Sequence, residues 1–181
     1  ILKLVAVRRA TDLVPESTCK VCECPNLLFF EREPQRGFHD FPGGPPLHDA
    51  AVDWQDSLVQ AIELAWWLGF RRLYLVGCEM RIEPEPEHRR IAADRGVEYR
   101  PNELLRAFYD RCRGAGLSVD DLESIAAAKP YHFDETKPIA AAIQTDFHYF
   151  RIAQYLRLSR RAMALAGLEL ISRTPGSRLN G

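Results

Sequence analysis

The chain has 181 residues, enough for one domain with a well-buried core. Charged residues make up 27% and apolar residues 46%, which is typical of a soluble globular protein, and the net charge of −1 does not indicate nucleic acid or an anionic membrane as a partner. The apolar runs are far too short to span a bilayer, so we expect no transmembrane segment and a cytoplasmic location.

Short apolar runs alternate with loops in the first quarter of the chain. Residues 2–7 and the "NLLFF" run at 26–30 are predicted strands. Residues 35–49 contain three Gly and three Pro, which are incompatible with a regular element. This segment is therefore expected to be a loop over a site or a disordered lid.

The most regular stretch begins near residue 53. Apolar residues recur at spacings of three and four, which predicts a helix over 53–68: Leu58, Ala61, Ile62, Ala65 and Leu68. Asp53 or Asp56 is the expected N-cap, and Gly69 is placed just past the C-terminus. The apolar run 73–76 follows directly and is predicted to be a strand buried on both faces, as in a parallel sheet.

The second half continues the alternation. Pro84 and Pro86 are expected to exclude a helix from the polar segment that begins at residue 81. Helices are expected at 102–112, 119–128 and 146–166, and Gly167 is expected to end the last of them. A strand at 168–171 and the turn "RTPGSRL" follow. The pattern predicts a single α/β domain over 1–181, with a mostly parallel sheet, helices on both faces and a variable insertion at 81–145.

Three cysteines lie close together in "CKVCECP", at Cys19, Cys22 and Cys24. Three thiolates of this spacing can bind zinc if a fourth ligand is near. The available candidates for that ligand are Cys112, His39 and His48. None of them stands at the spacing of a zinc knuckle, so we expect the three cysteines to be reduced and metal-free.

Two predicted strands end in short glycine-containing segments. In open α/β sheets ligands bind outside the carboxyl ends of the strands, and glycine lets the backbone approach a ligand closely. The N–H groups of "TPGS" can also face an anion. The candidate binding residues at these ends are Gly77, Glu79, Thr174, Gly176 and Ser177. The sequence therefore predicts one pocket bordered by both strand ends.

The segment "SLVQAIELAWWLGFRRLYLVGCEM" resembles one shared by the bacterial sialyltransferases of glycosyltransferase family 42 and the 6-hydroxymethylpterin diphosphokinase-like proteins. Both have a Ser-headed helix ending in L-G-[FY], then a strand reading [IL]-Y-L-x-G-x-D; Glu79 stands at the Asp position. The turn "TPGSRL" is similar again, and the likeness covers 55–80 and 146–179. It implies a Rossmann-like domain, whose first nucleotide-binding unit we expect to be missing from this chain.

The resemblance also implies a function. We expect a glycosyltransferase-like enzyme that uses a nucleotide-activated sugar donor and a glycan or small-molecule acceptor, in bacterial surface-polysaccharide or glycolipid assembly. In the sialyltransferases the Ser at the position of Ser57 lies in the nucleotide pocket, and a His before the last helix–strand unit is the general base. His148 and His132 both compete for that role. Imidazole suits it, because it titrates near neutral pH and can take the acceptor's proton.

Two other functions stay open at this point. A nucleotide-dependent diphosphokinase-like enzyme needs similar positive surroundings plus Mg²⁺ held by carboxylates, for which Glu79 is available. A non-catalytic α/β domain that binds a partner is the third. The sequence does not separate these functions, and it does not indicate an oligomeric state.

Overall fold

The computed structural model describes residues 1–34, 37–43, 50–126 and 137–180. These residues form six α-helices and five β-strands, which confirms the predicted α/β class. The chain packs as two compact units: the first unit comprises Ile1–Leu73 and Leu158–Ile171, and the second unit comprises Tyr74–Arg157 and Ser172–Gly181. Short 3-10 helices lie at Val7–Arg9, Val21–Glu23, Phe38–Asp40 and Arg178–Asn180. The single domain expected from the sequence stays a prediction.

A parallel three-stranded sheet lies in the first unit. Its strands are β1 (Lys3–Ala6), β2 (Leu27–Glu33) and β3 (Ala50–Val52), in that spatial order. Lys3 pairs with Leu27, and Glu31 pairs with Ala50, so both neighbours of β2 run parallel to it. The first two strands match the predicted ones. The three residues of β3 are too short for a periodic signal and were not expected.

Helix α1 (Ser57–Trp67) packs against β3 and follows the sequence pattern closely. The Asp56 carboxylate caps its start, because Oδ1 accepts the amide hydrogens of Leu58 at 2.9 Å and Val59 at 3.2 Å. Gly69 follows the helix with a φ of 93°, the left-handed conformation common just past a helix C-terminus. Both predicted ends of this helix are therefore confirmed, with Asp56 as the cap.

A buried carboxylate joins α1 to the segment before it. Glu63 has no exposed surface, and its oxygens accept hydrogen bonds from the backbone N–H groups of Val52 at 2.6 Å and Gly43 at 2.8 Å. Trp66 on the same helix donates its indole N–H to the carbonyl of Ala166 at 3.0 Å, just after α6 (Arg160–Leu165). These hydrogen bonds hold the segments of Gly43, Val52 and Ala166 against α1.

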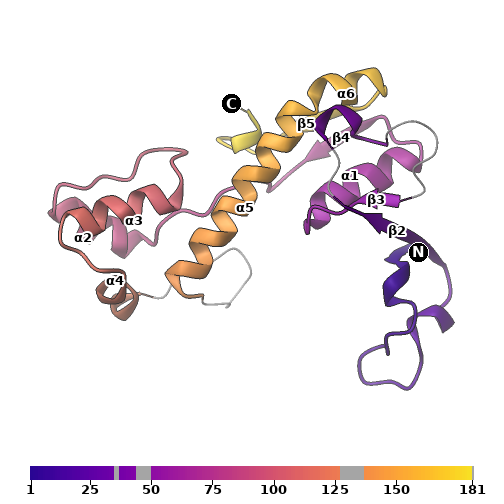
Figure 1. Ribbon diagram of the computed structural model, residues 1–181, viewed down its shortest axis with the longest axis horizontal. Helices are drawn as coiled ribbons and strands as arrows, with labels where there is room; N and C mark the ends of the chain where they lie inside the picture. The colour runs from indigo at the N-terminus through magenta and orange to yellow at the C-terminus, as the bar shows by residue number, and fades with distance from the viewer. Residues whose placement is uncertain (35–36, 44–49, 127–136, 181) are drawn as a thin grey trace. The chain divides into compact units, whose positions relative to one another are not determined.

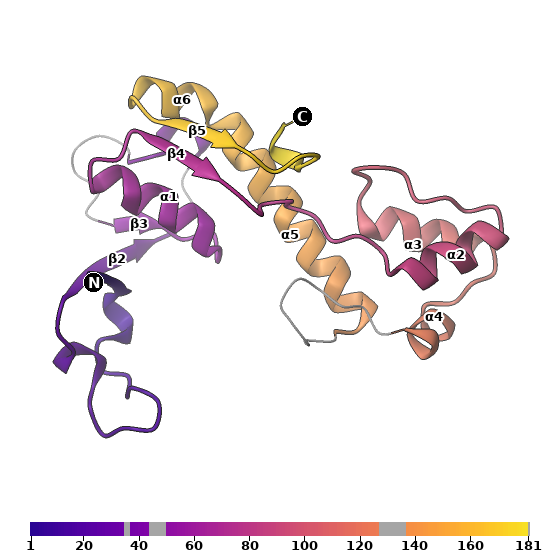
Figure 2. The same cartoon turned by 180° about the vertical axis from the view of Figure 1, so that it is seen from behind.

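The remaining strands are β4 (Arg72–Leu75) and β5 (Glu169–Ser172), which lie side by side in a two-stranded sheet (Figure 2). The backbone N–H of Glu169 donates to the carbonyl of Arg71, and the N–H of Arg173 donates to the carbonyl of Leu75, both at 2.8 Å. The residue numbers rise together along the pair, so it is parallel. Strands predicted near 73–76 and 168–171 in one sheet are confirmed. The prediction that the first of them is buried on both faces was wrong, because Arg72 and Tyr74 are exposed and only Leu75 is buried. A single Rossmann-like sheet with helices on both faces stays a prediction, because the described strands form sheets of three and two.

The second unit contains a helical cluster (Figure 1). Its helices are α2 (Pro86–Asp94), α3 (Leu105–Gly114), α4 (Val119–Ile125) and α5 (Ile139–Leu158). Phe108 and Leu122 are among the fully buried side chains that pack there with Ile139. The region read as an insertion therefore builds a hydrophobic core of its own.

Two sequence predictions in this region were wrong. The pair Pro84 and Pro86 was expected to exclude a helix, but α2 begins at Pro86. Proline is tolerated at the first helical position, where its missing N–H would have no intrahelical partner anyway. The long helix was expected to run from 146 to 166. It begins at Ile139 instead, directly after Pro138, and a break at Ser159 separates α5 from α6.

Within the described part of the chain, none of the helices has the length and apolar content needed to cross a bilayer.

Candidate functional site

The two predicted strand ends lie together in the second unit. The N–H of Cys78, after β4, donates to the Thr174 hydroxyl at 2.9 Å, and the Ser177 hydroxyl donates to the Cys78 carbonyl at 2.6 Å. The Ser177 oxygen also accepts the N–H of Leu179 at 3.1 Å. Thr174 and Ser177 are buried, so these hydroxyls hold the two segments against each other.

Two glycines shape these segments. Gly77 and Gly176 both have a φ of 68°, the left-handed region in which a residue with a Cβ is strained. The carbonyl of Gly176 accepts a hydrogen bond from Nη1 of Arg81. Glu79 is half-buried, and its carbonyl accepts the N–H of Arg178 at 3.2 Å. The predicted donor-binding residues of these two ends are therefore brought together, and their backbone is tightly fixed.

A surface hollow of about 310 Å³ opens beside the TPGS turn, within the second unit. It is lined by Asn102, Phe150, Gln154, Arg157, Gly176, Ser177, Arg178 and Asn180. Phe150, Gln154 and Arg157 are spaced by four and three residues on α5, so they share one face of that helix. The hollow thus joins one helix face to the turn that follows β5.

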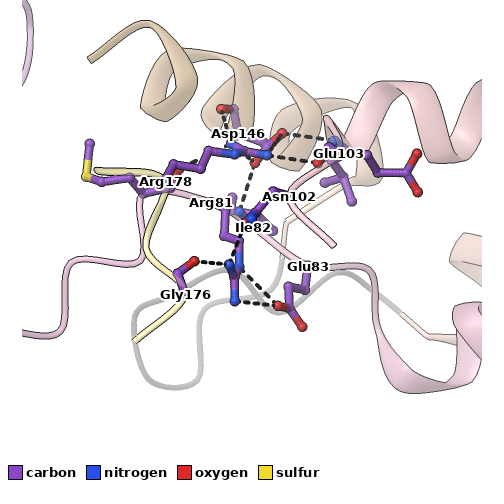
Figure 3. A network of polar contacts seen from close by, with 10 residues as sticks. Arg81, Ile82, Glu83, Asn102, Glu103, Asp146, Gly176 and Arg178 are labelled. Carbon is purple, nitrogen blue, oxygen red and sulfur yellow. Dashed lines mark hydrogen bonds and ion pairs between the residues drawn. The ribbon is translucent and has the colours of Figure 1, made fainter. Parts of the chain in front are cut away.

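A buried ion pair lies under this hollow (Figure 3). Asp146 is 1% exposed and Arg178 is 7% exposed, and Nη1 of the arginine lies 2.8 Å from Oδ1 of the aspartate. The aspartate also accepts the amide hydrogens of Ile82 and Leu105, both at 2.9 Å. Arg178 donates further to the carbonyls of Met80 at 3.1 Å and Glu103 at 2.9 Å. One carboxylate thereby joins α5, the C-terminal segment and the chain before α2 and α3.

A second arginine fixes two residues of the hollow's lining. Besides the Gly176 carbonyl, Arg81 donates to the side-chain oxygen of Asn102 at 2.8 Å and pairs with Glu83 at 3.0 Å (Figure 3). Glu83 also lies 3.6 Å from Arg89 on α2. Arg81 and Arg89 thus both have a carboxylate partner in this structure. Arg90 pairs with Glu87 and Asp94 on α2.

The charge of the hollow is set by Arg157. The lining contains two arginines and no carboxylate, and the charge of Arg178 is balanced by Asp146. Arg157 is half-buried, and its guanidinium makes no ion pair or hydrogen bond with another residue of the described chain. Gln154, one turn before it, is also half-buried. A guanidinium without a carboxylate partner, beside an exposed glycine turn, has the charge and the donors to bind an anion.

The predicted histidine base is not part of this lining. His148 is half-buried on α5, and its ring lies 6.4 Å from the ring of Tyr149. It is two residues before Phe150, and at 100° per residue the two side chains leave the helix on different faces. His132, the competing candidate, lies outside the described residues. The structure therefore brings together the strand ends but does not bring His148 into the hollow.

Ser57, the other candidate carried by the resemblance, is the exposed first residue of α1 in the first unit. The helix is capped by Asp56, so the serine hydroxyl is not needed for capping. Its proposed contact with a nucleotide stays a prediction.

The clustered cysteines are free thiols. Cys19 and Cys22 are exposed and Cys24 is half-buried. Across the described residues no group of three His, Cys, Asp or Glu side chains is arranged to hold a metal ion. Of the fourth-ligand candidates, Cys112 is buried in the helical core, His39 is exposed and 3.2 Å from Asp40, and His48 lies outside the described residues.

A histidine that the sequence did not single out is buried in the helical cluster. The ring of His88 has no exposed surface, and its Nε2 lies 2.9 Å from the Leu122 carbonyl. A carbonyl can only accept, so Nε2 donates to it, and Nδ1 lies 2.8 Å from the Tyr109 hydroxyl, which can either donate or accept. Both ring nitrogens are engaged within the core, which indicates a structural role.

Sequence reasoning also missed Asp146, Arg178, Arg157 and Phe150. Arg178 lies in the quoted turn "TPGSRL", but its partner is 32 residues away and no local pattern pairs them. Arg157 falls in "RLSRRAMA", which reads as a solvated helix face. Its spacing of seven from Phe150 is the signal that places both on one face.

Comparisons with protein-family models, with curated proteins and with solved structures found no match for this chain.

Proposed function

We propose that the hollow beside the TPGS turn binds the phosphate of a nucleotide-activated sugar donor, and that the protein is a glycosyltransferase-like enzyme. The observation that carries this proposal is Arg157, an unpaired cation within the described chain, in a hollow whose lining has no carboxylate. Sugar transfer leaves negative charge on the departing nucleotide phosphate, and a preorganised guanidinium stabilises that charge.

The other lining residues suit the rest of a nucleotide. Phe150 offers an aromatic surface on which a base can stack, and the side chains of Gln154 and Asn102 offer amide groups for hydrogen bonds. The Gly176 backbone allows a close approach by the phosphate. The segment resemblance supports the same assignment, because both strand ends fall inside its two matching stretches.

The proposed reaction needs a base for the acceptor hydroxyl. His148 and His132 remain the candidates. Because His148 is not on the face of α5 that lines the hollow, it can act as the base only if the acceptor extends from the hollow around α5. The residues lining the hollow do not fit a magnesium ion, since none is a carboxylate and Asp146 is committed to Arg178 and two backbone amides. Surface-polysaccharide or glycolipid assembly in the bacterial cytoplasm is the setting that the resemblance suggests.

Calorimetric titration tests the proposal. The protein is titrated with CMP, UDP and GDP, their sugar conjugates, ATP and GTP. Arg157→Gln is expected to weaken binding of the preferred nucleotide by about 10- to 100-fold, the usual effect of losing one hydrogen bond to a charged group. Arg161→Gln is the matched control, because Arg161 is an exposed arginine on α6 outside the hollow and should leave binding unchanged.

The outcomes distinguish the functions that the sequence left open. Preferred binding of a nucleotide sugar supports the transferase. Binding of ATP or GTP alone favours a diphosphokinase-like enzyme. No nucleotide binding, or equal affinity of Arg157→Gln and the unmodified protein, contradicts the proposed site and leaves the partner-binding domain as the better account.

A further inference from the structure

Two exposed asparagines line the hollow beside the TPGS turn. Asn102 lies shortly before α3, and Asn180 lies in the C-terminal segment. We propose that these two amides have fixed and opposite polarity, with Asn102 donating to an oxygen of the ligand's phosphate and Asn180 accepting from a sugar hydroxyl. The ligand class that fits is a phosphate ester of a sugar, such as the ribose phosphate of a nucleotide, an assignment that rests on the function proposed for this hollow.

Arg81 fixes the direction in which the Asn102 amide faces (Figure 3). Its Nη1 lies 2.8 Å from Oδ1 of Asn102, and because a guanidinium can only donate, the atom beside it must be the amide oxygen. Glu83 holds the guanidinium from another side, with its Oε1 3.0 Å from Nε. The amide nitrogen of Asn102 has no hydrogen-bond partner among the described residues. Since the residue is exposed, a ligand can reach this nitrogen and its two N–H donors from solvent.

Asn180 has the opposite polarity. Its Nδ2 donates to the Thr174 carbonyl at 2.9 Å, and because a carbonyl can only accept, the nitrogen end of this amide is occupied. The backbone N–H of Asn180 donates to the Ser177 carbonyl at 3.0 Å, which holds the residue against the turn. Oδ1 has no donor partner within the described part of the chain, so it is the atom that can accept a hydrogen bond from a ligand.

The two amides and Arg157 together define the class of ligand. Arg157 and Asn102 offer donors, and the lining has no carboxylate to repel an anion. A phosphate supplies several acceptor oxygens and takes charge-assisted hydrogen bonds from such donors. The Asn180 oxygen needs a donor in return, which a phosphate monoester lacks when fully ionised and a sugar hydroxyl supplies. A sugar phosphate meets both requirements in one molecule.

NMR titration of the full ¹⁵N-labelled chain at pH 8 tests the pair with two probes, methyl phosphate and ribose 5-phosphate. Both are dianions at this pH, because the second pKa of a phosphate monoester is about 6, and only the ribose carries hydroxyl donors. Both probes should shift the side-chain NH₂ signals of Asn102 saturably. Ribose 5-phosphate should bind about 3- to 10-fold more tightly than methyl phosphate, the gain from one ordinary hydrogen bond.

Variants separate the two roles. Asn102→Gly removes the amide at a position whose φ of 64° suits glycine, and affinity for both probes should fall at least about tenfold. Asn26→Gly is the matched control, because Asn26 is also exposed and has a φ of 59° but lies in the first unit, outside the hollow. Asn180→Ala should abolish the preference for ribose 5-phosphate and leave the affinity for methyl phosphate unchanged.

The assignment is overturned if neither probe shifts the Asn102 signals, if Asn102→Gly binds as well as the unmodified chain, or if the unmodified chain binds both probes equally. Nucleotide binding that depends on Arg157 but leaves the Asn102 signals unmoved refutes the assignment and keeps the proposed function. Ribose 5-phosphate bound at Asn102, with no nucleotide sugar bound, supports the assignment and refutes the proposed function. Should a variant disturb folding, the two probes on the unmodified chain decide the matter alone.

Discussion

Removing the charge of Asp146 should cost the second unit more stability than any exposed ion pair. Asp146→Asn keeps the size of the side chain but leaves the guanidinium of Arg178 buried without its counter-ion. Both side chains are almost fully enclosed, at 1% and 7% exposure, so water cannot replace the lost carboxylate. Breaking one partner of a buried pair costs about 3–5 kcal/mol.

Hydrogen exchange at two amides reports this loss locally. The N–H groups of Ile82 and Leu105 both donate to the Asp146 carboxylate at 2.9 Å. Their protection should fall by roughly 10²- to 10⁴-fold in Asp146→Asn, which is the free-energy loss converted at about 1.4 kcal/mol per factor of ten. Asp110→Asn is the control, because Asp110 is an exposed residue on α3 whose pair with Arg113 is at the surface.

The control variant should leave the exchange of both amides unchanged. A loss of protection below about tenfold in Asp146→Asn, or an equal loss in both variants, would refute the argument that the buried pair organises the floor of the hollow.

Two further predictions concern groups buried in the helical cluster. Burial raises the pKa of the Cys112 thiol, so a disulfide reagent at pH 8 should modify the exposed Cys19 and Cys22 quickly and Cys112 only after denaturation. Peptide mass spectrometry measures the three rates, and equal rates for Cys112 and the exposed cysteines would contradict the prediction. Burial also raises the pKa of the Tyr109 phenol, so its contribution to stability is complete below its unfolded value of about 10 and is lost as the pH rises above it. We therefore expect the free energy of unfolding in urea to fall less between pH 9 and pH 11.5 for Tyr109→Phe than for the unmodified protein. An equal fall in both proteins would contradict this prediction.

The element that sequence predicts best is α1 with the strand that follows it. Its apolar spacing, the acidic cap at Asp56 and the glycine at 69 are local signals that agree with one another, and the structure follows all of them. The strand ends after β4 and β5 could be predicted for the same reason. Each follows a helix, a glycine and an apolar run, and parallel strands place their carboxyl ends on one edge.

The polar interior of the second unit could not be predicted in this way. Asp146 reads as the start of a helix, whereas α5 begins at Ile139 and places the aspartate two turns inside. Its partner Arg178 belongs to the C-terminal turn, and only the fold brings the two together. The start of α2 at Pro86 was hidden because proline at the first helical position looks, in sequence, like a helix breaker. The base candidate His148 was chosen by position along the chain, which does not specify the helix face.

Nucleotide-induced shifts in the NMR spectrum of the labelled protein test the central claim most directly. With the nucleotide that calorimetry ranks tightest, the largest shifts should fall on the amides of Gly176 and Ser177 and on the Nε–H of Arg157, because these groups line the hollow. Saturating shifts at these positions, absent in Arg157→Gln, are the predicted result. Shifts confined to residues outside the hollow, such as those around Ser57, would contradict the assignment of the nucleotide site to the ends of β4 and β5.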